Sequence, residues 1–105
     1  MAVFKIVFMF VAQNADPEKH RVSLSTSPGR ELVVIGVKDY KQAVEVSKKL
    51  VEQEGVGVIE LCAGFGHVGT AEVAKAVGNK VRVGVVRFDS HPALEFKSGD
   101  DIFKI

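Results

Sequence analysis

Val58 to Gly69 reads V-I-E-L-C-A-G-F-G-H-V-G and runs on into an apolar-periodic stretch from Thr70 to Val77. A short apolar run that enters a glycine turn and leaves with helical periodicity predicts a strand, a loop and a helix N-terminus. The glycines stand at Gly64, Gly66 and Gly69 and match the spacing G-x-G-x-x-G. In this strand-to-helix setting such a loop lets backbone N–H groups approach a phosphate, so we take it as the first candidate ligand site.

An acidic residue stands where the dinucleotide-binding fingerprint expects one. Asp89 follows Gly69 by twenty positions, and in that fingerprint the acid binds a ribose hydroxyl. Only sixteen residues follow Asp89, which is too few for a complete dinucleotide-binding fold. We therefore expect a mononucleotide, a phosphate or a carboxylate rather than NAD or FAD, and the cofactor stays unknown. The alternative is that the three glycines only allow a tight strand-to-helix turn.

Length and composition describe one domain over residues 1–105, with 47% hydrophobic and 26% charged residues. The 14 Lys and Arg nearly balance the 13 Asp and Glu, so no broad field favours nucleic-acid binding. The single cysteine, Cys62, cannot form an intrachain disulfide and fits a reducing compartment. We expect a cytoplasmic protein without a nucleic-acid partner.

The N-terminal run M-A-V-F-K-I-V-F-M-F-V-A is apolar at both odd and even positions. Its one charge, Lys5, lies inside the run, no small-residue cleavage site follows, and the run is far shorter than the roughly 20 residues of a membrane span. We predict a buried strand over Val3 to Val11, in the middle of a sheet flanked by helices, and no membrane association.

The remaining pattern alternates strands and helices. Asp16 and Pro17 allow at most a short helix. The other predicted elements are a half-exposed strand over Val22 to Thr26, a buried strand over Leu32 to Val37, a helix from Asp39 to Gly55, a strand over Val58 to Ala63, a helix ending at Gly78 and a strand over Val81 to Phe88.

This order predicts an α/β fold with three layers and a mostly parallel sheet of four or five strands with two main helices, like half of a Rossmann or flavodoxin unit. Two helices cover a sheet with apolar residues on both faces poorly. We therefore expect a homo-oligomer, most simply a dimer, that buries leftover apolar surface together with the tail from Ile102 to Ile105.

Parallel sheets bind ligands beyond the carboxyl ends of their strands. The function-capable residues expected there are Asn14, Lys38, Cys62, the loop Gly64 to His67, Arg87, Asp89, Ser90 and His91. The carboxyl ends of the last two predicted strands carry most of these residues, and they predict a site for a small anionic metabolite or nucleotide. The expected ligand-binding residues are Gly64, Phe65, Gly66, His67, Arg87, Asp89 and His91.

Two other chemistries use overlapping residues. His67, Asp89 and His91 offer an N, O, N ligand set, but no metal-binding spacing supports it, so we predict no metal. The alternative is a loop held by a hydrogen bond from Arg87 to Asp89 or from Asp89 to Ser90. In a noncatalytic assembly or partner-binding protein, these residues would only fix loops and an interface.

Glu60, Cys62 and His67 are weak candidates for an acid–base or thiol enzyme, and whether the protein is an enzyme stays open. Glu60 and Cys62 project to the same side of their predicted strand, and a helix follows the thiol. A carboxylate buried in a strand needs a partner, for which Lys5 and Arg82 are available. The alternative is that Cys62 serves as a small buried hydrophobe.

Four phrases together resemble a known family: A-D-P-E-K-H-R at 15–21, V-V-I-G-V-K-D-Y at 33–40, E-L-C-A-G-F-G-H-V-G at 60–69 and V-G-V-V-R-F-D-S-H-P at 83–92. Over essentially its full length the chain is similar to a family of small prokaryotic α/β proteins catalogued as a domain of unknown function. This resemblance implies an α/β fold and brings no activity, substrate or residue roles.

Overall fold

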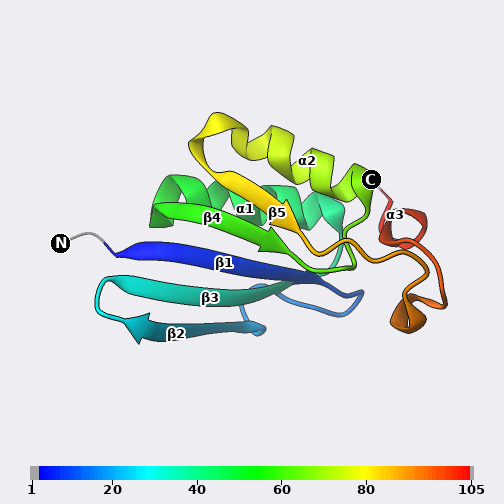
Figure 1. Ribbon diagram of the computed structural model, residues 1–105, viewed down its shortest axis with the longest axis horizontal. Coiled ribbons are helices and arrows are strands. Elements are labelled where there is room, and N and C mark those ends of the chain that lie inside the picture. Colours follow the sequence, from blue (N-terminus) through cyan, green and yellow to red (C-terminus); the bar gives the residue numbers. More distant parts are fainter. Residues whose placement is uncertain (1–2, 105) are drawn as a thin grey trace.

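The computed structural model describes residues 3–104 and shows one five-stranded sheet with helices packed on it (Figure 1). The strands are β1 (Phe4–Val11), β2 (Arg21–Ser27), β3 (Arg30–Val37), β4 (Val56–Leu61) and β5 (Arg82–Val85). The helices are α1 (Tyr40–Glu54), α2 (His67–Val77) and α3 (Gly99–Ile102), with 3-10 turns η1 (Gly78–Lys80) and η2 (Pro92–Leu94). Within residues 3–104, no helix is long and apolar enough to cross a membrane.

The strand order is β2-β3-β1-β4-β5. β1 pairs in parallel with both β3 and β4, β4 pairs in parallel with β5, and β2 runs antiparallel to β3. The predicted mostly parallel sheet is confirmed, and so is the central position of the N-terminal strand. β2 folds back on β3 and forms the antiparallel edge of the sheet.

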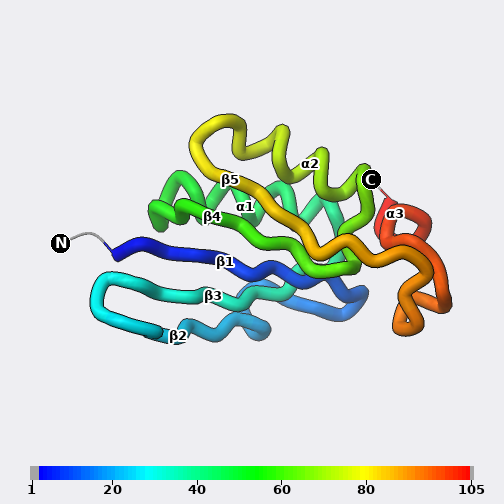
Figure 2. Tube along the Cα trace, viewed as in Figure 1, coloured from blue at the N-terminus to red at the C-terminus, as the bar shows by residue number. Residues whose placement is uncertain are grey.

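The expectation of three layers is wrong. α1 and α2 pack against each other and lie on the same side of the sheet (Figures 1 and 2). The reason lies in the strand order: the crossovers from β3 to β4 and from β4 to β5 both advance in the same direction across the sheet. Right-handed crossovers that advance in the same direction place their helices on the same face.

The core lies between the sheet and these two helices. Alternate residues of β1, Val7, Met9 and Val11, are buried there beside their neighbours from β3 and β4. The intervening residues of β1 face away from the helices; of these, Phe8 and Phe10 are only partly buried. β1 is therefore apolar on both faces, as its sequence indicates, although the helices of the chain cover only one of them.

Local signals fix the ends of α1. Asp39 accepts a hydrogen bond from the Gln42 N–H at 2.8 Å, and the Gln42 side chain accepts one from the Lys38 N–H at 2.8 Å. Gly55 ends the helix at φ 65°, a conformation that favours glycine. α2 ends at Gly78, which also has a positive φ, 64°. These predicted helix ends are confirmed.

Two sequence expectations differ from the structure. β5 ends at Val85 rather than continuing to Phe88, because the last segment turns away along the carboxyl edge of the sheet. The stretch expected to hold at most a short helix forms a turn at Asp16, whose carboxylate accepts the Glu18 N–H at 2.9 Å. Of the expected interface tail, Phe103 is instead buried in the core of its own chain, Ile102 packs partly buried against it, and Ile105 lies outside the described residues.

Candidate functional site

The glycine loop, α1 and the C-terminal segment meet at Tyr40. This residue is fully buried, and its ring stacks on Phe65 of the glycine loop with centroids 5.4 Å apart. Phe103 lies against the same ring at 5.9 Å. Burial of three aromatic rings holds the last residues of the chain against the first turn of α1.

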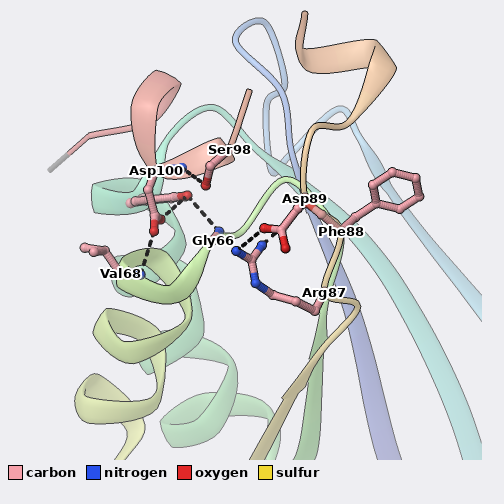
Figure 3. A network of polar contacts seen from close by, with 8 residues as sticks. Gly66, Val68, Arg87, Phe88, Asp89, Ser98 and Asp100 are labelled. Carbon is pink, nitrogen blue, oxygen red and sulfur yellow. Dashed lines mark hydrogen bonds and ion pairs between the residues drawn. The ribbon is translucent and has the colours of Figure 1, made fainter. Parts of the chain in front are cut away.

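The N-terminus of α2 binds a carboxylate of the same chain. Asp100 accepts hydrogen bonds from the Val68 N–H at 2.9 Å (Figure 3) and from the Gly69 N–H at 3.1 Å. The Tyr40 hydroxyl donates to Asp100 at 2.9 Å and accepts from the Gly66 N–H at 3.1 Å. The free N–H groups of a helix start attract anions, and here Asp100 supplies the negative charge.

The protonation states of this pair follow from its contacts. Burial alone would raise the pKa of Asp100, but the N–H groups of Val68 and Gly69 and the Tyr40 hydroxyl together lower the pKa of that carboxyl below its ordinary value. Burial, with the Asp100 charge beside it, raises the pKa of Tyr40 well above its ordinary value. At neutral pH Tyr40 is therefore a proton donor and Asp100 an ionised acceptor.

The glycines of the loop make these close approaches possible. A Cβ on Gly66 would overlap the Asp100 carboxylate, and a Cβ on Gly69 would overlap the Tyr40 ring. A Cβ on Gly99 would overlap the Gly64 carbonyl. Any side chain at Gly66 would displace Asp100, so a substitution there cannot test ligand binding without disturbing the fold.

Arg87, Asp89 and His91 do not form a strand face, since β5 ends before them. Arg87 and Asp89 pair with each other and point toward one another in Figure 3. His91 accepts the Ala93 N–H at 2.9 Å through Nδ1, and its ring centroid lies 4.6 Å from that of Phe88. These contacts match the alternative in which the residues stabilise a loop.

The weak enzyme candidates are also separated. Glu60 is exposed on the sheet face that carries no helix, whereas Cys62 packs against the core at the start of the glycine loop. His67 is exposed at the start of α2. Of the two possible partners of Glu60, Lys5 pairs instead with Glu54 at 3.3 Å, and Arg82 is exposed on the neighbouring strand, with no ion pair to Glu60 among the described residues. Within residues 3–104, no group of three His, Cys, Asp or Glu side chains could hold a metal ion.

A pocket of about 850 Å³ opens at the carboxyl end of β1. It is lined by Phe10, Val11, Ala12, Gln13, Asn14, Ala15, His20, Ala93, Leu94, Glu95, Ile102 and Phe103. The chain leaves β1 toward β2 and leaves β4 toward β5, which is the opposite direction. Diverging connections at the carboxyl ends of adjacent parallel strands are where α/β sheets bind ligands.

Of the candidate site residues named from the sequence, only Asn14 lines this pocket. The others belong to the neighbouring glycine loop, to the turn after β5 or, like Lys38, to exposed positions elsewhere. Ile102 and Phe103 are apolar in the sequence, but they line the same pocket as residues 12–15 only because of the path that the last segment takes. No local sequence signal indicates that path.

The C-terminal segment forms one wall of the pocket under backbone strain. Glu95, a lining residue, has φ 57°, and its neighbour Phe96 has φ 61°. Ser90, where the segment leaves the sheet, has φ 52°. Positive φ at residues other than glycine is unfavourable, and such strain gathers at binding and switching sites.

The chain belongs to the family described as "Family of unknown function (DUF6506)", which it matches over residues 4–101. The family resemblance drawn from the four sequence phrases is thereby confirmed. No curated protein matches the chain.

Proposed function

We propose that the protein binds a small molecule in the pocket at the carboxyl end of β1. The observation that carries this proposal is the pocket itself. Its volume of about 850 Å³ falls within the range of small-molecule sites, roughly 300–1,000 Å³. Its position beside diverging strand connections is the one that sheet topology favours for a ligand.

The residues that line the pocket indicate which kind of ligand it would bind. Apolar side chains such as Phe10, Leu94 and Ile102 favour an apolar or aromatic body, and Gln13 and Asn14 offer hydrogen bonds at one side. Among the lining residues, His20 supplies an imidazole ring. Its Nδ1 accepts the Asp16 N–H at 2.8 Å, so Nε2 carries the ring proton and can donate to an acceptor atom of a ligand. A ligand oxygen would therefore lie near His20 rather than near the Glu95 carboxylate, which also lines the pocket.

The glycine loop serves this site indirectly. Asp100, bound at the start of α2, lies two residues before Ile102, a wall of the pocket. The contacts of Asp100 thus hold the wall in place. In this account the N–H groups at the start of α2 fix the position of the C-terminal segment by binding Asp100.

A pocket-filling substitution tests the proposal. Ala12 is exposed at the pocket, and Ala12→Trp would occupy the space of a ligand. The probes are nucleotides, aliphatic and aromatic carboxylates and heteroaromatic fragments, screened by thermal shift and confirmed by calorimetry. A probe at a hundred times its Kd adds about 2.7 kcal/mol, which raises Tm by several degrees in a domain of this size.

The matched control is Ala71→Trp, at an exposed position of α2 away from the pocket. The proposal expects the same stabilising probe for the native chain and for Ala71→Trp, and a loss of that stabilisation in Ala12→Trp. Equal binding by Ala12→Trp, or no binding by any probe class, would contradict it.

A further inference from the structure

The sheet face opposite α1 and α2, which we name the open face, is strongly apolar. Cross-strand pairing places the same-facing side chains Phe4, Ile6, Phe8, Phe10, Val22, Leu24, Leu32, Val34 and Val58 on it. Several are half exposed: 44% for Phe4, 56% for Val22 and 50% for Leu24. An apolar patch of this extent on a soluble protein marks an interaction surface.

Two glycines flatten this face. A Cβ on Gly36 would overlap the Phe10 ring, and a Cβ on Gly57 would come within 2.6 Å of the Phe4 ring. Both rings therefore lie down on the sheet over a glycine of the neighbouring strand. The result is a smooth aromatic surface suited to packing against another sheet.

Charged residues are few on the open face and are placed asymmetrically. Glu60 of β4 and Arg82 of β5 both belong to it and are both exposed. Glu60 is level with Gly84, whereas Arg82 is level with Val58, so the two charges sit on adjacent strands one step apart. Arg30, at the amino end, lies over the Phe4 ring at 5.9 Å.

The pairing register defines a line that runs across all five strands of the sheet. It passes through one residue of each strand, in sheet order Ser23, Val33, Val7, Ile59 and Val83. On either side of that line the open face shows the pairs Val22 and Leu24, Leu32 and Val34, Ile6 and Phe8, Val58 and Glu60, and Arg82 and Gly84.

We propose that a second copy of this chain packs on the open face about a two-fold axis along that line. The rotation stacks each strand on its own counterpart and exchanges the two sides of the line. Apolar positions then meet apolar positions across β1, β2 and β3. Glu60 comes above Val58 of the partner subunit, beside Arg82 of the partner subunit, and the reciprocal pair forms at the same time.

The area is adequate for such a dimer. The two longest strands have eight residues at about 3.3 Å each, and five strands lie about 4.8 Å apart, so the face is on the order of 26 by 20 Å at its widest. With side-chain relief, the accessible area on each copy approaches the roughly 800 Å² of a standard interface. Two sheets stacked about 10 Å apart also leave room for an arginine to reach a carboxylate on the neighbouring strand.

Self-complementarity distinguishes this occupant from an unrelated protein. A foreign partner needs no particular relation between Glu60 and Arg82, whereas a two-fold rotation turns an acid and a base on opposite sides of its axis into two equivalent pairs between the subunits, and Glu60 and Arg82 are placed in that way. Phe10 belongs to both the open face and the pocket at the end of β1, so a second copy would also enclose one side of that pocket.

The test is the molar mass in solution by sedimentation velocity and light scattering, with the full chain and charge-reversal variants. We expect the native chain at twice 11.4 kDa at micromolar concentration. Glu60→Arg and Arg82→Glu each place like charges together and should raise the dimer Kd about tenfold or more. The double variant Glu60→Arg/Arg82→Glu restores the pairing and should recover the native Kd.

Leu24→Lys supplies a second variant, because this half-exposed residue can be replaced without opening the core. It should yield folded monomers, as judged by circular dichroism. Its matched control is Phe96→Lys, at a residue 69% exposed in the C-terminal segment, which should stay dimeric. A monomeric native chain, or a double reversal no tighter than the single ones, would overturn the proposal.

Discussion

At the scale of single residues, Asp100 makes three contacts that no local sequence pattern indicates. Its carboxylate takes up two N–H groups at the start of α2 and the Tyr40 hydroxyl. The G-x-G-x-x-G spacing predicted a ligand site at this loop, and in the structure the N–H groups of Val68 and Gly69 beside it bind Asp100. The sequence could not show that this anion comes from the same chain, since Asp100 lies more than thirty residues beyond the loop.

Replacing Asp100 tests this contact through its pH dependence. The pKa of its carboxyl is lower in the folded chain than its ordinary value of 3.8. Ionised Asp100 therefore stabilises the fold fully above about that pH, and the stabilisation is lost as pH falls through the folded pKa. We expect Asp100→Asn to lower the free energy of unfolding by about 1 kcal/mol at pH 7.

Urea unfolding from pH 7 to pH 2 measures this difference. The two proteins should converge in stability at the acid end. A constant difference between them at every pH would show that the charge of Asp100 contributes nothing.

At the scale of elements, the start of α2 approaches α1 through Gly69 and Tyr40. A methyl group on Gly69 would overlap the buried ring, although alanine is the better helix former by about 1 kcal/mol. We expect Gly69→Ala to destabilise the fold by about 1–3 kcal/mol, because overpacking outweighs helix propensity. Thermal or urea unfolding measures it.

A double-mutant cycle isolates the contact between the two elements. In a Tyr40→Leu background the ring is gone, so Gly69→Ala should cost clearly less. An equal cost in both backgrounds would mean that the glycine is needed for another reason.

The ends of helices and strands could be predicted where nearby residues supply a cap or a turn, and could not be predicted elsewhere. Asp39 and Gly55 mark α1 within a residue or two because a cap and a positive φ are properties of nearby residues. The end of β5 was misjudged: Val86 and Phe88 continue its apolar pattern, yet the segment leaves the sheet there. Beyond that point Asp100 and Phe103 pack against the start of α2 and the core, contacts that no pattern within residues 82–88 indicates.

At the scale of the whole molecule, composition and the sequence of predicted strands and helices along the chain indicated an α/β fold, whereas the number of layers depends on the strand order within the sheet. Apolar residues on both faces of β1 suggested helices on both sides. Both crossovers advance in one direction, so the second apolar face stays open within one chain. The pocket could not be predicted, because its walls come from both ends of the sequence.

The central claim is that a ligand binds at the carboxyl end of β1, and amide chemical-shift mapping on the ¹⁵N-labelled chain tests it most directly. The titrant is the fragment that most stabilises the native chain. The account predicts shifts concentrated at residues 12–15, 20 and 93–95, with the amides of Val68 and Gly69 still bound to Asp100. Shifts concentrated at residues 66–69, with residues 12–15 unchanged, would contradict it.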